Sequence, residues 1–229
     1  MQPTYFITGT DTGVGKTVLT ALLARFLRAR GLQVAAFKPV CSGGRGDARA
    51  LRAALGGALT LDEINPWHFR AAIAPSLAAK LEGKSVSLAQ VLAHIRARQT
   101  HFDATLVEGA GGLLSPLGRN FDSRDLLLAL RATPILVAPN KLGVVNHLLL
   151  TLEALPKSCR AKTKIVLMSP VRPDSATATN VRLLSEFFPP ENIVGLPWLA
   201  SPDTPEMVLR KLPVKRALAV LTGTSPARI

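Results

Sequence analysis

Residues 9–17 read GTDTGVGKT and connect a short apolar run to a long amphipathic segment. Glycines let such a loop approach an anion closely, and the amino end of a following helix adds a favourable field. Lys16 can reach the terminal phosphates of a nucleotide, and the Thr17 hydroxyl can bind a magnesium ion that bridges them. The stretch therefore predicts a phosphate-binding loop with nucleotide contacts at Gly13, Val14, Gly15, Lys16, Thr17 and Val18.

The flanking sequence supports this interpretation, although the loop departs from the usual consensus G-x-x-x-x-G-K-[ST]. Thr10 stands five residues before Gly15, and Gly9 lies one position too early. The loop follows an apolar run at residues 5–8 and precedes residues 18–30, whose apolar side chains fall on one helical face. A glycine-rich structural turn would explain the glycines but not the lysine and threonine, so we favour a nucleotide site.

Short β-rich runs alternate with longer helical patterns, which is typical of a parallel sheet with crossover helices. We expect an α/β fold of the P-loop NTPase type, with a doubly wound, mostly parallel sheet flanked by helices. Expected strands lie at residues 5–8, 34–38, 104–107, 135–138, 164–168 and 193–196, and expected helices start near residues 16, 48, 88, 123, 145 and 179. The 229 residues, 48% of them hydrophobic, suit a single domain over 1–229. The tail after about residue 211 is harder to assign, and we expect its last few residues to be loosely held.

Composition bounds the partners and the compartment. The formal net charge is +13, but the arginines are spread over helices, so we expect attraction of anionic nucleotides and no nucleic-acid partner. Cys41 and Cys159 stand far apart and match neither a disulfide framework nor a zinc motif. The sequence has no signal-peptide pattern before residue 9 and no run of about 18 apolar residues. We therefore expect a cytoplasmic protein without a membrane partner.

Three charged residues follow or lie near predicted strand ends, where ligands bind in a sheet of this type. A buried, unpaired lysine is costly, so Lys38 either faces solvent or meets an anion, and its position favours the anion. Glu108 could hold magnesium opposite Thr17, and a helix-capping role is the weaker alternative. Asp47 could cap a helix or join the metal ligands.

Two loops after later strands could contact a substrate. The glycines that follow Glu108, at residues 109, 111 and 112, would let backbone amides approach it closely. Residues 139–143 lead into a helix whose start could receive a carboxylate. Asn146 and His147 on that helix could equally lie on an exposed helical surface.

Six short stretches together point to one family. GTDTGVGKT, KPVCSG, GDARAL, VEGAGG, NKLGVVNH and GLPWL occur in this order over about residues 4–200. The set closely resembles the dethiobiotin synthetase family of the biotin pathway. The resemblance implies a homodimeric ligase that depends on Mg²⁺ and ATP. It implies that the small-molecule substrates are 7,8-diaminopelargonic acid and CO₂, which are joined through a carbamate into the cyclic urea of dethiobiotin.

The resemblance also assigns roles to individual residues. It places Lys16 on the β- and γ-phosphates, and Lys38 between the carbamate and the γ-phosphate. Thr17, Asp47 and Glu108 would surround magnesium. The resemblance puts the catalytic positions at Lys16, Lys38, Thr12 and Ser42, the substrate contacts at Thr12, Lys38, Ser42, Gly111, Gly143, Val144 and Asn146, and further nucleotide contacts at Glu108, Ser169, Pro197 and Leu199.

The chain departs from the family pattern at two places. Ser169 and Pro170 stand where members often have an Asn-Asp pair that reads adenine, and Gly13 stands where many have a glutamate. Pro170 lacks a backbone N–H, and Ser169 offers a single hydroxyl. We therefore expect that other nucleoside triphosphates can replace ATP.

Two alternative functions share the loop. One is a partitioning-type or nitrogenase-iron-protein-type ATPase switch that acts on DNA or a protein partner, but such proteins usually carry a lysine where this chain has Asp11. The other is a related amide- or carbamate-forming ligase, such as a cobyrinate amidase without its glutamine-handling domain. The short chain and the KPVCSG stretch favour the diamine substrate.

Overall fold

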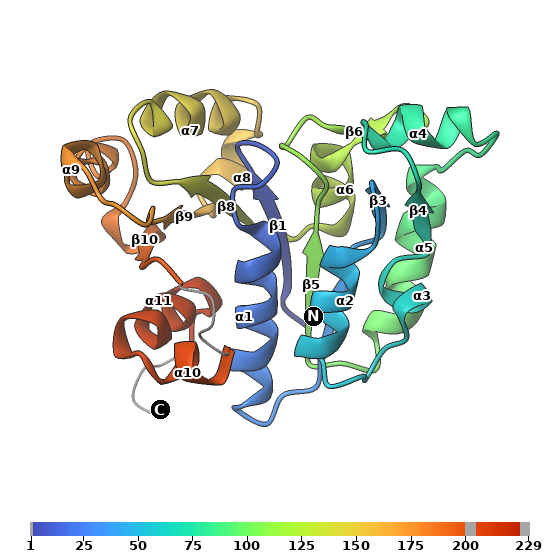
Figure 1. Ribbon diagram of the computed structural model, residues 1–229, viewed down its shortest axis with the longest axis horizontal. Coiled ribbons are helices and arrows are strands. Elements are labelled where there is room, and N and C mark those ends of the chain that lie inside the picture. Colours follow the sequence, from blue (N-terminus) through green and yellow to red (C-terminus); the bar gives the residue numbers. More distant parts are fainter. Residues whose placement is uncertain (1, 200–204, 225–229) are drawn as a thin grey trace.

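Six apolar strands form one parallel sheet at the centre of the computed structural model, which describes residues 2–199 and 205–224 (Figure 1). Across the sheet the strands follow the order β10-β9-β8-β1-β5-β2. Each neighbouring pair runs parallel. Their bounds are β1 Thr4–Gly9, β2 Val34–Phe37, β5 Ala104–Glu108, β8 Thr133–Pro139, β9 Lys164–Met168 and β10 Ile193–Leu196.

Burial explains why these runs form strands. Every residue of β2 and β5 is buried, because helices cover both faces of a parallel sheet. All six predicted strands are confirmed, and four of them are shifted by one or two residues at an end. The shift that matters is at Lys38, which lies just beyond β2 and not inside it. Its backbone N–H donates to the Ile64 carbonyl (2.9 Å) and not to a neighbouring strand.

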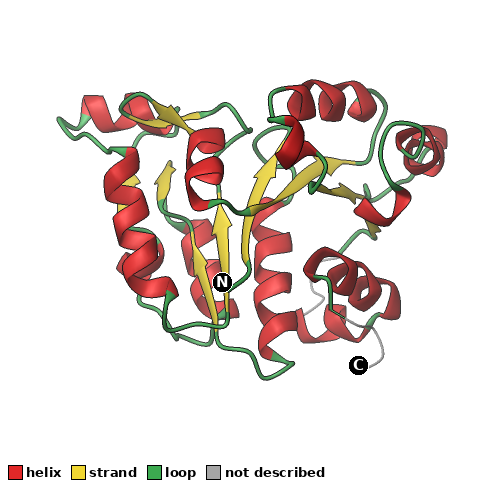
Figure 2. Cartoon of the chain, turned by 180° about the vertical axis from the view of Figure 1, so that it is seen from behind, coloured by secondary structure: helices red, strands yellow, loops and turns green. Residues whose placement is uncertain are grey.

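Helices cover both faces of the sheet, which confirms the doubly wound fold (Figures 1 and 2). One layer contains α1 Lys16–Arg28, α2 Gly46–Ala54, α10 Pro205–Arg210 and α11 Leu212–Thr222. The other contains α5 Leu88–Gln99, α6 Ser123–Leu130, α7 Val144–Glu153, α8 Lys157–Arg160 and α9 Ser175–Leu184. The shorter described elements are α3 Leu61–Ile64, α4 Pro75–Leu81, the 3₁₀ helix η1 Pro190–Asn192, the parallel pair β3 Val40–Ser42 and β4 Trp67–Phe69, and the antiparallel pair β6 Pro116–Gly118 and β7 Phe121–Asp122.

The predicted helix starts agree with the structure at residues 16, 88 and 123, and α2 and α7 begin two residues and one residue earlier than expected. The helix predicted near residue 179 begins at Ser175, because the Asp174 carboxylate caps it by accepting from the backbone N–H of Thr177 (2.7 Å). The sequence analysis did not identify α3, α4, α8, α10 or α11. The first four have only four to seven residues each, too few for a clear apolar period.

The sheet topology places a crevice beside the phosphate-binding loop. β1 lies between β5 and β8. From β1 the chain moves toward the edge of the sheet formed by β2. From β5 it crosses past β1 to β8, toward the opposite edge formed by β10. Such a reversal opens a crevice at the carboxyl ends of the strands. Gly9 and Glu108 end β1 and β5 at this edge.

The segment after residue 211 joins the same core. α11 packs against β10 and α1, and Leu218 is fully buried. The Tyr5 hydroxyl donates to the Thr222 carbonyl (3.0 Å), which links β1 to the end of α11. The loosely held terminus expected from the sequence lies outside the described residues. In the described part of the chain, no helix is both long and apolar enough to cross a membrane.

We predict that Leu218→Ala lowers the free energy of unfolding by about 2–5 kcal/mol, because it leaves a cavity between α11 and the sheet. Denaturation should remain a single transition if the chain is one domain. The matched control is Leu212→Ala on the same helix, an exposed position where we expect a change within about 0.5 kcal/mol. A separate early transition for the C-terminal segment would contradict the single-domain expectation.

Candidate active site

The phosphate-binding loop spans residues 10–15, between β1 and α1. Gly15 occupies the helix cap with a φ of 100°, a left-handed conformation that favours glycine. Within the described residues, no side chain caps the first turn of α1 and no acidic residue lies in it. The amino end of α1 can therefore offer its backbone N–H groups to an anion.

Lys16 is buried inside this loop. Its Nζ donates to the Asp11 carbonyl (2.7 Å). Burial, and then the nearby Lys38 ammonium, lower the pKa of Lys16 to about 8. An anion placed in the loop would stabilise the charged form of this lysine.

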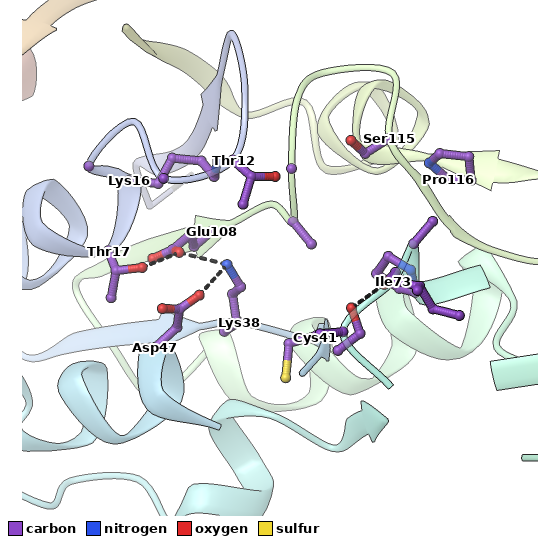
Figure 3. A pocket seen from close by; sticks show the side chains of 18 of the residues that line it. Thr12, Lys16, Thr17, Lys38, Cys41, Asp47, Ile73, Glu108, Ser115 and Pro116 are labelled. Carbon is purple, nitrogen blue, oxygen red and sulfur yellow. Dashed lines mark hydrogen bonds and ion pairs between the residues drawn. The ribbon is translucent and has the colours of Figure 1, made fainter. Parts of the chain in front are cut away.

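Four side chains, three from helices or strands and one from the residue after β2, meet at the carboxyl edge of the sheet (Figure 3). The Glu108 side chain is buried, and its Oε1 accepts from Thr17 Oγ1 (2.7 Å) and from Lys38 Nζ (2.7 Å). Lys38 Nζ also lies 2.9 Å from Asp47 Oδ2 and donates to the Gly109 carbonyl (3.0 Å). A strand end, two helix starts and the residue after β2 thus form one network.

Lys38 and Asp47 stabilise each other in the ionised state. Burial would lower the pKa of Lys38, but the Glu108 and Asp47 carboxylates outweigh it and raise this pKa. Burial would likewise raise the pKa of Asp47, but the Lys38 ammonium outweighs it and the pKa is lowered. Lys38 therefore meets anions and does not face solvent. Asp47 points toward Lys38 and does not cap α2, and Glu108 is followed by a turn and not by a helix.

The oxygen atoms of the network suit a hard cation. Glu108 Oε2 is buried and has no hydrogen-bond partner among the described residues, and Thr17 and Asp47 face the same cleft. Nowhere in the described residues do three His, Cys, Asp or Glu side chains gather as a metal site, and this network contains two carboxylates, those of Asp47 and Glu108. Mg²⁺ prefers few protein oxygens together with water and phosphate, so this donor set fits it.

The network forms one end of a cleft of about 720 Å³. The opposite wall comes from β3, residues 72–75, residues 110–111 and residues 115–116 (Figure 3). The Ser42 hydroxyl donates to the Ile73 carbonyl on this wall. The predicted site residues that line the cleft are Thr12, Gly13, Gly15, Lys16, Thr17, Val18, Lys38, Ser42, Asp47, Glu108 and Gly111.

Comparison with known proteins identifies the family. A family model described as an AAA domain matches residues 3–206. The chain is 46% identical over 166 residues to an ATP-dependent dethiobiotin synthetase BioD of Anaeromyxobacter sp. (strain Fw109-5), covering 71% of this chain and 74% of the relative. It is 41% identical over 198 residues to the BioD of Anaeromyxobacter dehalogenans (strain 2CP-C), covering 84% and 89%. This chain belongs to the dethiobiotin synthetase family. The BioD of Akkermansia muciniphila is 39% identical over 185 residues, covering 80% of this chain and 86% of the relative.

A solved structure supports the fold alone. The structure of pNOB8 ParA bound to nonspecific DNA matches with a TM-score of 0.57 and 14% identity, covering 97% of this chain and 96% of that one. At this identity the match shows a shared P-loop NTPase-like fold and nothing of function. The family resemblance stated from the sequence is confirmed by the dethiobiotin synthetase relatives, not by this neighbour.

The remaining residues that the dethiobiotin synthetase resemblance singled out lie outside the lining of the cleft. The Val14 side chain packs in the core although its loop borders the cleft. At the start of α7, Gly143 occupies the helix cap, the Val144 side chain is buried and Asn146 is exposed. Ser169 follows β9, and Pro197 and Leu199 follow β10; all three are half-buried. The Ser169 N–H donates to the Leu196 carbonyl (2.9 Å), which joins these two strand ends.

Sequence reasoning missed one wall of the dethiobiotin synthetase cleft. Residues 72–75, Ser115 and Pro116 line it but follow no predicted strand end, and Cys41 lies in the KPVCSG stretch but was given no role. Pro75, at the first position of α4, gave one usable signal, because proline is common there in helices. The other residues reach the cleft only through the folding of loops, which no local pattern predicts.

Proposed function

We propose that this chain closes the cyclic urea of dethiobiotin from 7,8-diaminopelargonic acid and CO₂ at the expense of ATP. Its membership of the dethiobiotin synthetase family supports an ATP-dependent ligase. The observation that carries the proposal is the buried Lys38 ammonium, which lies between two carboxylates beside a phosphate-binding loop. A cytoplasmic location belongs to the proposal, in keeping with two free cysteines.

The reaction needs placed cations more than a protein nucleophile. One substrate amine adds to CO₂ and loses a proton, which gives a carbamate. A carbamate oxygen attacks the γ-phosphorus, and ADP leaves. The second amine then attacks the carbamate carbon, the C–O bond to phosphate breaks, and the ring closes with loss of a proton. Negative charge grows on oxygens in each transfer, so preorganised positive charge lowers the barrier.

The residues of the cleft match these steps. Lys16 would hold the β- and γ-phosphates, and Lys38 would lie between the carbamate and the γ-phosphate. Thr17, Asp47 and Glu108 would hold Mg²⁺, which supplies charge neutralisation at the phosphate oxygens. Thr12 of the phosphate-binding loop, with Ser42 and Gly111 on the opposite wall, would contact the diamine. The apolar side chain of Ile73 would face its methylene chain.

The alternative of an ATPase switch on DNA or a protein partner has less support. The shared fold with ParA does not favour it, because that match is 14% identical. Asp11 stands where such switches usually carry a lysine, and its carboxylate accepts from the Thr12 N–H (2.6 Å). A cobyrinate-amidase-like ligase is likewise disfavoured by the dethiobiotin synthetase relatives.

The decisive measurement is phosphate release from ATP with and without the diamine and bicarbonate. We expect release to require both, and Lys38→Met to lower turnover by about 10²-fold or more, because a preorganised charge is lost. Melting of the variant checks that it is folded, since breaking a buried ion pair also destabilises. Lys162→Met, at an exposed lysine, is the matched control and should keep full turnover. Release without the diamine, stimulated instead by DNA, would refute the proposal.

We also propose a two-fold homodimer in which the substrate carboxylate reaches the subunit interface at Gly143, Val144 and Asn146. No side chain of the described residues caps the start of α7, so its first-turn N–H groups suit a carboxylate, although the Val144 N–H donates to the Lys141 carbonyl (3.2 Å). Large apolar side chains lie exposed nearby, with Leu142 82% and Leu150 64% exposed. Such exposed apolar surface is typical of a contact between copies of a chain.

We expect the protein to sediment as a dimer and Leu150→Glu to sediment as a monomer with reduced activity, because a buried charge would oppose association. Phe187→Glu, at an exposed apolar residue after α9, is the control and should remain dimeric. Full activity of a native protein that sediments as a monomer would rule out this interface.

The base of the nucleotide has few directional partners at the end of β9. The Ser169 N–H is already bonded to Leu196, and Pro170 has no N–H to offer. The phosphate-binding loop is indifferent to the base. We propose that this site discriminates weakly among nucleoside triphosphates.

We predict that GTP and CTP support the reaction with kcat/KM within about 10-fold of ATP, a gap of about 1.4 kcal/mol. Ser169→Asn adds an amide that can pair with adenine and should raise the preference for ATP, whereas Ser169→Ala should not. A preference of the native protein for ATP above about 10³-fold would show that another segment reads the base.

A further inference from the structure

Asn65 follows α3, and its side chain is fully buried beside the cleft. Its Nδ2 donates to the Lys38 carbonyl (2.7 Å). Its Oδ1 accepts from Arg45 Nε (3.2 Å) and lies 3.2 Å from the Cys41 thiol. Burying an amide is costly unless both of its ends are paired, so these partners fix the orientation of the group.

The Asn65 amide gives the backbone of Lys38 a hydrogen bond in place of one from a neighbouring strand. Because Lys38 lies beyond β2, no neighbouring strand holds its backbone. Its N–H donates to the Ile64 carbonyl (2.9 Å), and its carbonyl accepts from Asn65. Residues 64 and 65 therefore set both the position and the direction of the backbone from which the Lys38 side chain extends.

The other end of the amide reaches the helix that carries Asp47. Arg45 directly precedes α2, and its Nη2 donates to the carbonyls of Leu61 (2.7 Å) and Asn65 (2.9 Å). Asp47 lies in the first turn of α2 and meets Lys38 Nζ at 2.9 Å. One buried side chain thus connects the backbone of the lysine to the start of the helix that presents its carboxylate.

We propose that Asn65 is a positioning residue for the reaction, which sets the Lys38 ammonium against the Asp47 carboxylate through the Lys38 backbone and Arg45. Asn65 does not itself line the cleft, so any effect on the reaction passes through the residues that it contacts. The inference rests on the proposed function for the roles of Lys38 and Asp47. A displacement of such groups by about 1 Å can cost about 10²-fold in rate, so a fixed tether between them has catalytic value.

The test uses Asn65→Leu and Asn65→Asp in the full-length protein. Both keep the branching and the number of heavy atoms of the asparagine side chain and remove the donor to the Lys38 carbonyl, and only the second adds charge. We expect both to lower kcat by about 10- to 100-fold while the affinity for ATP in EDTA stays within about 2-fold, because the phosphate-binding loop is intact. We also expect the gain in ATP affinity on adding magnesium to shrink, because Asp47 is no longer held.

Matched variants separate positioning from folding. Arg45→Lys keeps the positive charge but loses the planar guanidinium that contacts Asn65 and Leu61. We therefore expect smaller losses of kcat and of the magnesium-dependent gain in ATP affinity. If the Asn65 variants do not fold, this variant decides the test. Asp62→Asn is the control and should change nothing. The Asp62 side chain is 83% exposed and forms an ion pair with Arg45. The substitution removes this partner of Arg45 and leaves Asn65 unchanged.

Two results would overturn the proposal. One is a folded Asn65 variant whose kcat and magnesium-dependent ATP affinity both stay within about 2-fold of the native values. The other is a parallel loss of kcat and of metal-free ATP affinity, which would mark a general structural role. The magnesium-dependent affinity does not require the diamine, so it tests Asn65 even if the native protein fails to form dethiobiotin.

Discussion

A lysine ammonium held out of water is the constraint on which the rest of this site depends. Removing such a charge from water costs several kcal/mol unless opposite charges stand at fixed places around it. Lys38 finds them in Glu108 from β5 and in Asp47 from α2. The sheet order, in which β5 lies between β1 and β2, brings the phosphate-binding loop to the same place. The order of the strands therefore decides which charges surround Lys38.

Much of the fold could be predicted because its signals are local. The six strands are continuous apolar runs buried on both faces, and the loop at residues 9–17 joins one of them to a long amphipathic helix. The start of α9 was misplaced because its capping by Asp174 is a side-chain contact that an apolar period does not reveal. The short helices were missed for lack of length.

The site was predictable where it lies at strand ends and unpredictable where it depends on loops. Lys38 and Glu108 could be placed because parallel strands end at one edge. The pairing of Lys38 with Asp47, and not only with Glu108, needed the structure, since residue 47 follows no predicted strand end. Asn65 gave no signal at all, because a buried amide looks like any other asparagine in a sequence. Its two partners in the proposed tether, Arg45 and Lys38, are 20 and 27 residues away.

The position of β1 has a consequence for how the chain folds as it is made. β1 is made before the other five strands of the sheet, yet Thr4 pairs with Thr105 and Tyr5 pairs with Thr133. The hydroxyl of Tyr5 meets its acceptor only when Thr222 has been added. Such distant pairings cost loop entropy before they contribute stability. The central strand is therefore made before both of its neighbours in the sheet, and the phosphate-binding loop gains its full support from the sheet only after β8 has been made.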